Sequence, residues 1–255
     1  MASVADQTGV DVEHIIQDAG SQGDLQALAQ SKPNVRLFVE KDSGMYDAIN
    51  RGLRRASGEI CAYLNCDEQY LPGALERVHN FFARNRDVNV LFADIILVAG
   101  DGCPLSYRRT ILPNLRHIKV AHLNTPTCAT FFRRELLNRG FYFDTRWKTI
   151  GDALWIEKLL LSKVAMATIR EPLAVFALTG KNLGETALSR SETVAWKGSE
   201  QNRLILAGAV LLHRLRKALA GAYRRRSVQI EIFTLESPGN RQRFIANDVG
   251  FRWPT

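Results

Sequence analysis

An acidic cluster follows directly on a short apolar run in the first third of the chain. Residues 60–64 read Ile-Cys-Ala-Tyr-Leu and give way at once to Asn65-Cys66-Asp67-Glu68. A hard divalent cation such as Mg²⁺ or Mn²⁺ takes oxygen ligands and commonly bridges one or two carboxylates to the phosphates of a substrate. Asp67 could supply such a carboxylate. These residue types therefore indicate chemistry on a phosphorylated substrate held by a cation.

Hydrophobic spacing and turn residues predict the elements that position this cluster. Asp42-Ser43-Gly44 is a turn signal, and apolar residues then recur at helical spacing over residues 45–56 until a Ser-Gly pair ends the pattern. The apolar run at 60–64 is typical of a strand covered on both faces. In an open α/β sheet, ligands bind beyond the carboxyl ends of the strands. Asn65 and Asp67 are therefore predicted at the ligand-binding edge of a sheet.

The stretch over residues 40–73 resembles glycosyltransferase family 2. The family is commonly written D-x-G-x-Y-D-A-x-N-x-G, then G-E, then a strand ending in D-x-D or N-x-D-D. The chain has matching residues in the same order, namely Asp42, Gly44, Tyr46, Asp47, Ala48, Asn50, Gly52, Gly58, Glu59, Asn65 and Asp67. The resemblance implies an α/β fold of the Rossmann-like GT-A type.

The same resemblance implies roles for individual residues. It makes Asp67 the ligand of a divalent cation, Mn²⁺ or Mg²⁺, and it predicts the nucleotide-sugar contacts Asp42, Gly44, Asp47, Asn50 and Asn65. A second interpretation stays open, because Asp and Asn also serve in turns and at the starts of helices. Under that interpretation Asp42, Asp47 and Asn50 are structural, and Asp67 lies in a solvated turn.

The resemblance extends to both sides of this stretch. Upstream, a predicted strand runs into Asp18-Ala19-Gly20-Ser21, which is similar to the family's D-x-G-S loop, so Asp18 is expected to recognise the nucleotide base, or else to lie in an ordinary loop. The next acidic residue of the family is out of register here, where Asp24 follows a glycine. Downstream, residues 126–136 resemble the acceptor-side strand and turn, and Asp152 takes the place of the family's catalytic base. Asp152 could instead cap the helix that begins there.

These roles imply an inverting glycosyltransferase. The expected donor is a nucleotide-diphospho-sugar, by the resemblance a UDP-sugar, and the expected acceptor is a glycan or a lipid-linked sugar. A single base opposite the leaving group implies direct displacement with inversion. Nucleotidyl transfer is disfavoured, because no Gly-rich, Arg- or Lys-bearing loop is found near the start. A non-catalytic nucleotide- or membrane-binding remnant of the family remains the alternative.

Composition fits an enzyme in a reducing compartment. The chain has 255 residues, enough to bury a large core, and four scattered cysteines without a C-x-x-C pair. No signal peptide and no apolar run of membrane-spanning length is found, so a cytoplasmic protein is predicted. No pair of histidines has the spacing of zinc ligands, which argues against a zinc site.

The net charge of +8 comes largely from the C-terminal third. Residues 203–226 combine an apolar face with several arginines, which suits a basic helix lying on the inner, anionic face of a membrane. The alternative is a helix packed on the domain with its charges in water. Nucleic-acid binding is not expected, because the arginines are not interleaved with stacking aromatic residues. A catalytic domain over 1–180 and a C-terminal extension over 181–255 are predicted, joined by a flexible stretch over 181–201, with a strand at 228–234.

The first residues of the chain suggest a shortened start. Members of the family open with a strand that lies centrally in the sheet, beside the strand predicted here at 12–17. Residues 1–8 resemble the end of the helix that follows that opening strand. We therefore expect the usual first strand to be absent from the given sequence, which would leave the nucleotide pocket without one wall.

Overall fold

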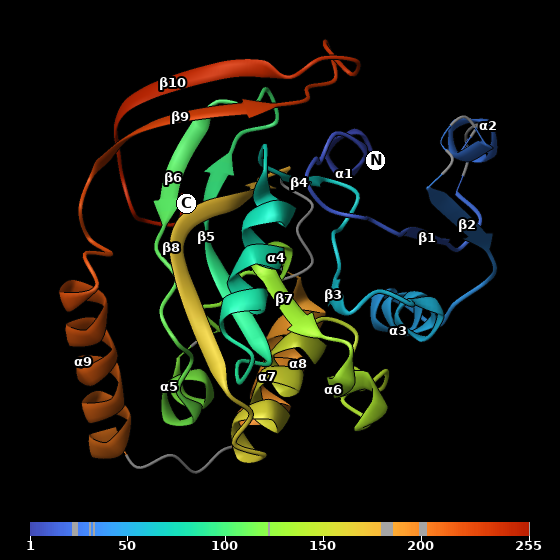
Figure 1. Cartoon of the computed structure of the whole chain (residues 1–255). Coiled ribbons are helices and arrows are strands. Elements are labelled where there is room, and N and C mark those ends of the chain that lie inside the picture. The colour runs from blue at the N-terminus through green and yellow to red at the C-terminus, as the bar shows by residue number, and fades with distance from the viewer. Residues whose placement is uncertain are drawn as a thin grey trace.

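A computed structural model describes residues 1–21, 25–30, 32, 34–121, 123–179, 186–198 and 203–254. Its centre is a six-stranded mixed sheet in which five strands run in the order β3-β7-β5-β8-β4 and β6 pairs with β5 (Figure 1). The strands are β3 (Ile60–Ala62), β4 (Glu68–Tyr70), β5 (Val90–Val98), β6 (Pro104–Arg108), β7 (Thr130–Arg133) and β8 (Met166–Ala177). Only β5 and β8 pair in parallel within this sheet, and the other pairings are antiparallel.

The sequence of β5 explains its central place. All nine of its residues, Val-Leu-Phe-Ala-Asp-Ile-Ile-Leu-Val, are buried. Its side chains alternate between two cores, because successive residues of a strand point to opposite faces. Phe92 packs in the core that contains Trp155 and Leu159, whereas Leu91 packs in the core that contains Val78 and Phe82. A strand covered on both faces reads as a continuous apolar run, and β5 does so apart from Asp94.

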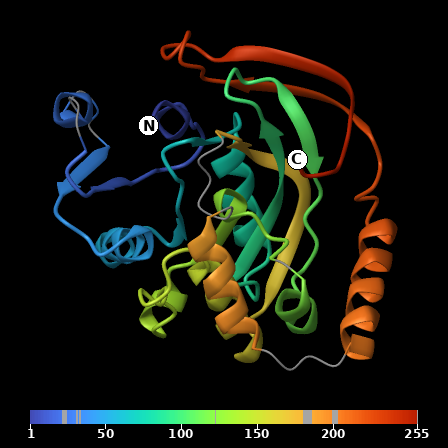
Figure 2. The same cartoon turned by 180° about the vertical axis from the view of Figure 1, so that it is seen from behind.

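Helices cover the two faces of this sheet. Figures 1 and 2 view the molecule from opposite sides and show α4 (Ala74–Arg84) over one face, with α7 (Gly151–Leu161) and α8 (Ala187–Lys197) over the other. The α8 helix is tied to α7 by a hydrogen bond of 2.6 Å from Trp196 Nε1 to Glu157. Shorter helical segments complete the body: α5 (Leu115–Val120), η1 (Thr127–Ala129) and α6 (Glu135–Asn138).

The N-terminal part forms a small sheet of its own. After α1 (Ala2–Ala5), β1 (His14–Asp18) pairs in parallel with β2 (Val35–Val39), and α2 (Leu25–Gln30) connects them. The helix α3 (Met45–Arg55) packs against β1 and leads into β3 of the large sheet. Among the described residues no strand pairs with both β1 and the large sheet, so β1 and β3 each have one edge without a strand partner.

The C-terminal part adds one long helix and a hairpin. The helix α9 (Arg203–Leu219) is followed by β9 (Arg226–Ile232) and β10 (Gln242–Val249), which pair antiparallel. The predicted strand is confirmed, since β9 alternates buried and exposed residues from Ser227 onward. The predicted flexible stretch over 181–201 is wrong where α8 forms, and its other parts at 181–185 and 199–201 lie outside the described residues. The division into domains at residue 180 stays a prediction.

The expected fold class is confirmed. The chain has the predicted α/β architecture, and the helix predicted over 45–56 is α3. All four cysteines are free thiols, two of them buried and two exposed. No helix in the part of the chain that the structure describes is both long enough and apolar enough to cross a bilayer.

Candidate active site

The turn between β3 and β4 presents one carboxylate to solvent and buries the next. Glu68 is buried, and its Oε2 atom accepts a hydrogen bond of 2.8 Å from the backbone N–H of Asn65, which fixes the turn. Burial raises the pKa of Glu68 to about 7. Asp67 is exposed, and no hydrogen bond or ion pair to its carboxylate is found among the described residues. The Asp67 carboxylate in this turn is therefore exposed and available as an oxygen ligand.

Asp152 lies at the start of α7 and is the second residue of that helix. Ile150 is the N-cap, so Asp152 does not occupy the capping position, although its Oδ1 atom accepts a hydrogen bond of 2.9 Å from the N–H of Ala153. The same oxygen accepts one of 3.1 Å from the hydroxyl of Tyr46 in α3. Burial raises the pKa of Asp152 above its ordinary value, while the Ala153 amide and the Tyr46 hydroxyl oppose that rise.

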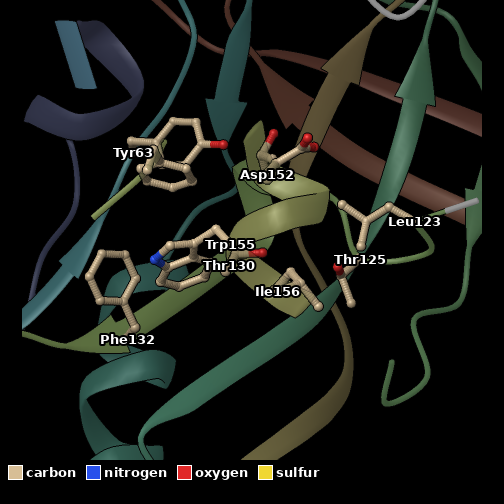
Figure 3. A pocket seen from close by; sticks show the side chains of 10 residues that line it. Tyr63, Leu123, Thr125, Thr130, Phe132, Asp152, Trp155 and Ile156 are labelled. Atoms are coloured by element: carbon tan, nitrogen blue, oxygen red, sulfur yellow. The ribbon is translucent and has the colours of Figure 1, made fainter. Parts of the chain in front are cut away.

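Two tyrosines border this carboxylate. Figure 3 shows Tyr63 and Asp152 together on the wall of a narrow pocket that Trp155, Ile156 and Phe132 also line. Burial, together with the nearby charge of Asp152, raises the pKa of Tyr63 and of Tyr46. Both phenols therefore stay protonated and neutral. They add no negative charge of their own beside the Asp152 carboxylate.

The close approach of α3 to α7 depends on Gly151. A Cβ atom added to Gly151 would lie 2.7 Å from the ring of Tyr46, which is closer than real Cβ contacts. The ring of Tyr46 also stacks on Phe143, with centroids 5.5 Å apart. Sequence reasoning gave Tyr46 no role of its own, although it lies in the family motif between Gly44 and Asp47.

Asn50 is committed to the scaffold. Its amide nitrogen donates a hydrogen bond of 2.8 Å to the carbonyl of Phe143, and its amide oxygen accepts one of 3.0 Å from the N–H of the same residue. Asn50 is 2% exposed. The side chain expected to contact the donor thus joins α3 to the loop before α7, which favours the structural interpretation.

Asp42 and Asp47 shape the turn before α3. Asp42 Oδ1 accepts a hydrogen bond of 2.9 Å from the N–H of Gly44, whose φ of 131° favours glycine. Asp47 accepts hydrogen bonds from the Ser43 N–H and from Arg51, and these contacts, that of Arg51 first, lower the pKa of Asp47 to about 2. Turn-forming contacts do not test whether these carboxylates also meet a ligand, so that role stays a prediction.

A second set of contacts links this turn to the loop before α7. Lys148 Nζ donates hydrogen bonds to the carbonyl of Ser43 at 2.8 Å and of Thr145 at 2.9 Å. Glu192 of α8 accepts from the backbone N–H groups of Lys148 and Thr149 at 2.8 and 2.9 Å. Sequence reasoning missed Glu192, which lies in the stretch predicted to be flexible. The loop that positions Asp152 is thus held from both sides.

Asp18 lies apart from these contacts, at the end of β1. Its carboxylate accepts hydrogen bonds from the N–H groups of Gly20 and Ser21, at 2.9 and 2.8 Å, and from the Ser21 hydroxyl. The Ser21 contacts, that of its hydroxyl first, lower the pKa of Asp18. No hydrogen bond joins Asp18 to Asp67 or Asp152 among the described residues. Asp24 lies outside those residues.

The oxygen-rich turn at Asp67 fits a single-carboxylate cation site. The described residues contain no group of three or more His, Cys, Asp or Glu residues placed to hold a metal ion. A cation of the Mg²⁺ or Mn²⁺ type keeps several waters and is bound by one or two carboxylates plus substrate phosphates. Asp67, exposed and unengaged, is a carboxylate of that kind.

Comparisons with known proteins agree with this architecture. Residues 1–141 match the sequence model of glycosyl transferase family 2. An uncharacterized glycosyltransferase of Nostoc sp. is 27% identical over 202 residues, which cover 73% of this chain and 62% of that protein. The chain spans less than two thirds of the length of the curated relatives it matches first.

Two solved structures show the same fold. S. aureus TarS in complex with UDP-GlcNAc superposes with a TM-score of 0.59 at 17% identity, over 87% of this chain and 70% of that one. A mannosyltransferase from Pyrobaculum calidifontis, in complex with GDP-Man and Mn²⁺, gives a TM-score of 0.51 at 17% identity, over 81% of this chain and 61% of that one. At such identity the likeness concerns the fold alone.

Proposed function

Because the chain belongs to glycosyltransferase family 2, we propose that it transfers a glycosyl group from a UDP-sugar to a hydroxyl of a glycan or lipid-linked acceptor, with inversion and with a divalent cation at Asp67. The observation that carries the proposal is the placement of Asp152. It lies at the start of α7, hydrogen-bonded to Tyr46, and it lines a pocket together with Tyr63, which precedes Asp67 by four residues. This placement supports a base and a cation ligand at one site.

Asp67 is proposed to bind the cation that stabilises the leaving group. Its carboxylate is free to bind a cation, and Glu68 holds the turn that aims it. When bound, the cation supplies Lewis-acid stabilisation of the charge on the departing diphosphate. Asn65 belongs to the same turn and is proposed as a donor contact. TarS bound to UDP-GlcNAc supports a UDP-sugar, and the Mn²⁺ in the mannosyltransferase complex supports a cation.

Asp152 serves the acceptor. The carboxylate takes the proton of the acceptor hydroxyl as the oxygen forms its bond to the anomeric carbon, and the electron pair of the broken bond leaves with the diphosphate. A carboxylate whose pKa is raised by burial is a stronger base than a solvated one. Attack from the side opposite the leaving group inverts the anomeric centre.

We assign the binding of the donor's nucleotide to the N-terminal sheet. Asp18 ends β1 in a loop that its own carboxylate orders, and we propose that this loop meets the base. Asp42, Gly44 and Asp47 form the turn before α3, which we propose lies along the donor. Asn50 is left out of this contact set, because both ends of its amide are engaged by Phe143.

Two substitutions separate the two roles. Asp67→Asn should weaken UDP binding in the presence of Mn²⁺ and hardly change it in EDTA, as measured by calorimetry. Asp152→Asn should keep UDP and Mn²⁺ affinity and lower transfer from a panel of UDP-sugars by roughly two to four orders of magnitude, the usual contribution of a general base. The anomeric configuration of the product, read by NMR, tests inversion.

A matched control is Asp101→Asn, which changes an exposed aspartate in the turn between β5 and β6. It should leave both binding and transfer unchanged. Equal UDP affinity of wild type and Asp67→Asn in Mn²⁺ would contradict the cation site. Tight UDP and Mn²⁺ binding by the wild type without turnover of any donor would favour the non-catalytic alternative.

A further inference from the structure

The α9 helix turns its leucines outward. Leu211, Leu215 and Leu219 recur every four residues, which places them on one face, and they are 69%, 54% and 79% exposed. Leu212, next to this face, is 55% exposed. Scattered apolar residues on a surface need no explanation, but a contiguous stripe of leucines along one helix marks an interaction surface.

The opposite face of α9 packs on the body, with half-buried Leu206, Ala209 and Val210 in its first half and His213, Arg216 and Lys217 in its second half. His213 is 4% exposed, and its ring stacks on that of His117 in α5 with centroids 3.3 Å apart. Arg216 donates a hydrogen bond of 3.1 Å to the carbonyl of Leu112. Burial, with the nearby charge of Arg108, lowers the pKa of Lys217 to about 8.

Over residues 211–219 this orientation is the reverse of that of an ordinary surface helix. Such a helix packs its apolar stripe on the core and leaves its polar face in water. The α9 helix packs on the domain with Arg214 in water, whereas Arg216 and Lys217 are half-buried beside the body. The leucine face is directed away from the domain and is available to a partner.

Cations flank the leucine face. Residues 203–226 contain no acidic residue. Arg214 is exposed beside the leucines and Arg224 is exposed just beyond the helix, and no ion pair of either is found within the described ranges. Arg225 pairs with Asp248, and Arg226 donates to the carbonyl of Gly221, so these two are partly engaged by the protein itself.

We propose that α9 is a docking surface for an anionic phospholipid bilayer, with its leucines in the acyl boundary and Arg214 and Arg224 at the headgroups. Leucines beside basic residues are the combination that binds an anionic interface. A second copy of the chain fits less well, because pairing two such helices would bring like charges together. Figures 1 and 2 show α9 and the β1–β2 sheet at opposite ends of the molecule, so this contact leaves the nucleotide end in water.

Vesicle flotation of the whole chain tests the proposal. Wild-type protein should float with vesicles of phosphatidylcholine and phosphatidylserine and much less with phosphatidylcholine alone. The triple variant L211S/L215S/L219S should lose about 1,000-fold in partition coefficient, since each of the three leucines withdrawn from lipid costs about tenfold. The double variant R214Q/R224Q should lose about fivefold per charge at low salt and less at high salt.

The matched control is L161S/L235S/I245S, which removes three other exposed apolar side chains, 63%, 95% and 64% exposed, away from α9. It should float like the wild type, and all variants should melt like the wild type because the changed side chains are exposed. Failure of the wild type to float at low salt, or equal flotation of the leucine variant and this control, would overturn the proposal. So would a wild-type dimer that the leucine variant dissociates without any vesicle binding, because the face would then be a self-association surface.

Discussion

The large sheet and the β1–β2 sheet bury their residues very differently. All nine residues of β5 are buried, whereas all five residues of β1 are only half-buried and those of β2 are half-buried or exposed. Part of the difference lies in composition, since β5 is apolar at eight of nine positions and β1 at only two of five. A strand in the middle of a sheet is covered by neighbours on both edges and by helices on both faces. The β1–β2 pair has one strand pairing and relies on α3 for cover.

The α3 helix joins the two regions. On one side it packs against β1, and on the other Tyr46, Asn50 and Leu53 enter the core beneath the large sheet. The proposed donor contact Asp18 belongs to the first region, and Asp67 and Asp152 belong to the second. The candidate site therefore spans both regions, and α3 with its contacts is the joint between them. These contacts should govern activity as much as stability.

A pair of phenylalanine truncations measures the difference between the regions. Phe92→Ala in β5 removes a fully buried ring and should lower the free energy of unfolding by about 3–5 kcal/mol. Phe38→Ala in β2 removes a half-buried ring that Arg55 covers at 4.3 Å, and it should cost about 1 kcal/mol. Urea unfolding followed by circular dichroism checks both. Equal losses would mean that the two sheets form one cooperative core.

Asn50→Ala tests the contact between α3 and the loop before α7. The substitution leaves the buried N–H and carbonyl of Phe143 without their side-chain partner, which should cost about 2–4 kcal/mol. UDP affinity and turnover should fall as well, although Asn50 is not placed against the donor. The control Asn85→Ala removes an exposed side-chain bond to the Phe81 carbonyl and should change stability by less than about 0.5 kcal/mol. Wild-type melting of the Asn50 variant would show that the joint lies elsewhere.

Gly151→Ala tests the close contact between α3 and α7. The added methyl group meets the ring of Tyr46, so overpacking should cost about 1–3 kcal/mol and displace the Tyr46 hydroxyl from Asp152. Transfer should fall while UDP affinity stays near that of the wild type. Gly100→Ala, where a Cβ atom meets nothing within 4 Å, is the control and should be within about 0.5 kcal/mol of the wild type. An active, stable Gly151 variant would mean that Tyr46 does not position Asp152.

The sequence predicts local elements better than the contacts between them. Helical spacing predicts α3, and the apolar run predicts a buried strand, because both patterns depend on near neighbours. The bond from Tyr46 to Asp152 joins residues 106 positions apart, and only the packing of α3 on α7 creates it. A signal for Asn50 was present, since it lies four residues after Tyr46 and three before Leu53, on the buried face of α3.

The orientation of α9 shows a second limit. Its sequence predicts an apolar and a basic face, but amphipathic spacing does not say which face the protein covers. His117 on α5 offers a stacking partner to His213, and this contact joins residues distant in the sequence. Residue types along one helix carry no information about such a partner.

Tyr46→Phe gives the smallest and most specific change at the joint. The ring keeps its packing on Phe143, so stability should fall by only about 1 kcal/mol. The lost hydroxyl donates to the charged form of Asp152 and lowers the pKa of that carboxyl, so without it the pKa rises further. A base with a higher pKa is protonated, and inactive, at a higher pH. The acid limb of kcat/KM should therefore move to higher pH.

The pH profile separates this effect from a loss of fold. On the acid limb kcat/KM should fall by roughly tenfold, the scale of one hydrogen bond to a charged group, and above it the variant should approach the wild type. Tyr142→Phe, which changes a half-buried tyrosine packed under Arg54, is the control and should leave the profile in place. A uniform loss at every pH would assign Tyr46 to packing alone. An unmoved acid limb without any loss of activity would mean that the Tyr46 hydroxyl does not act on the titrating base, and would leave the contact between the two regions a matter of stability only.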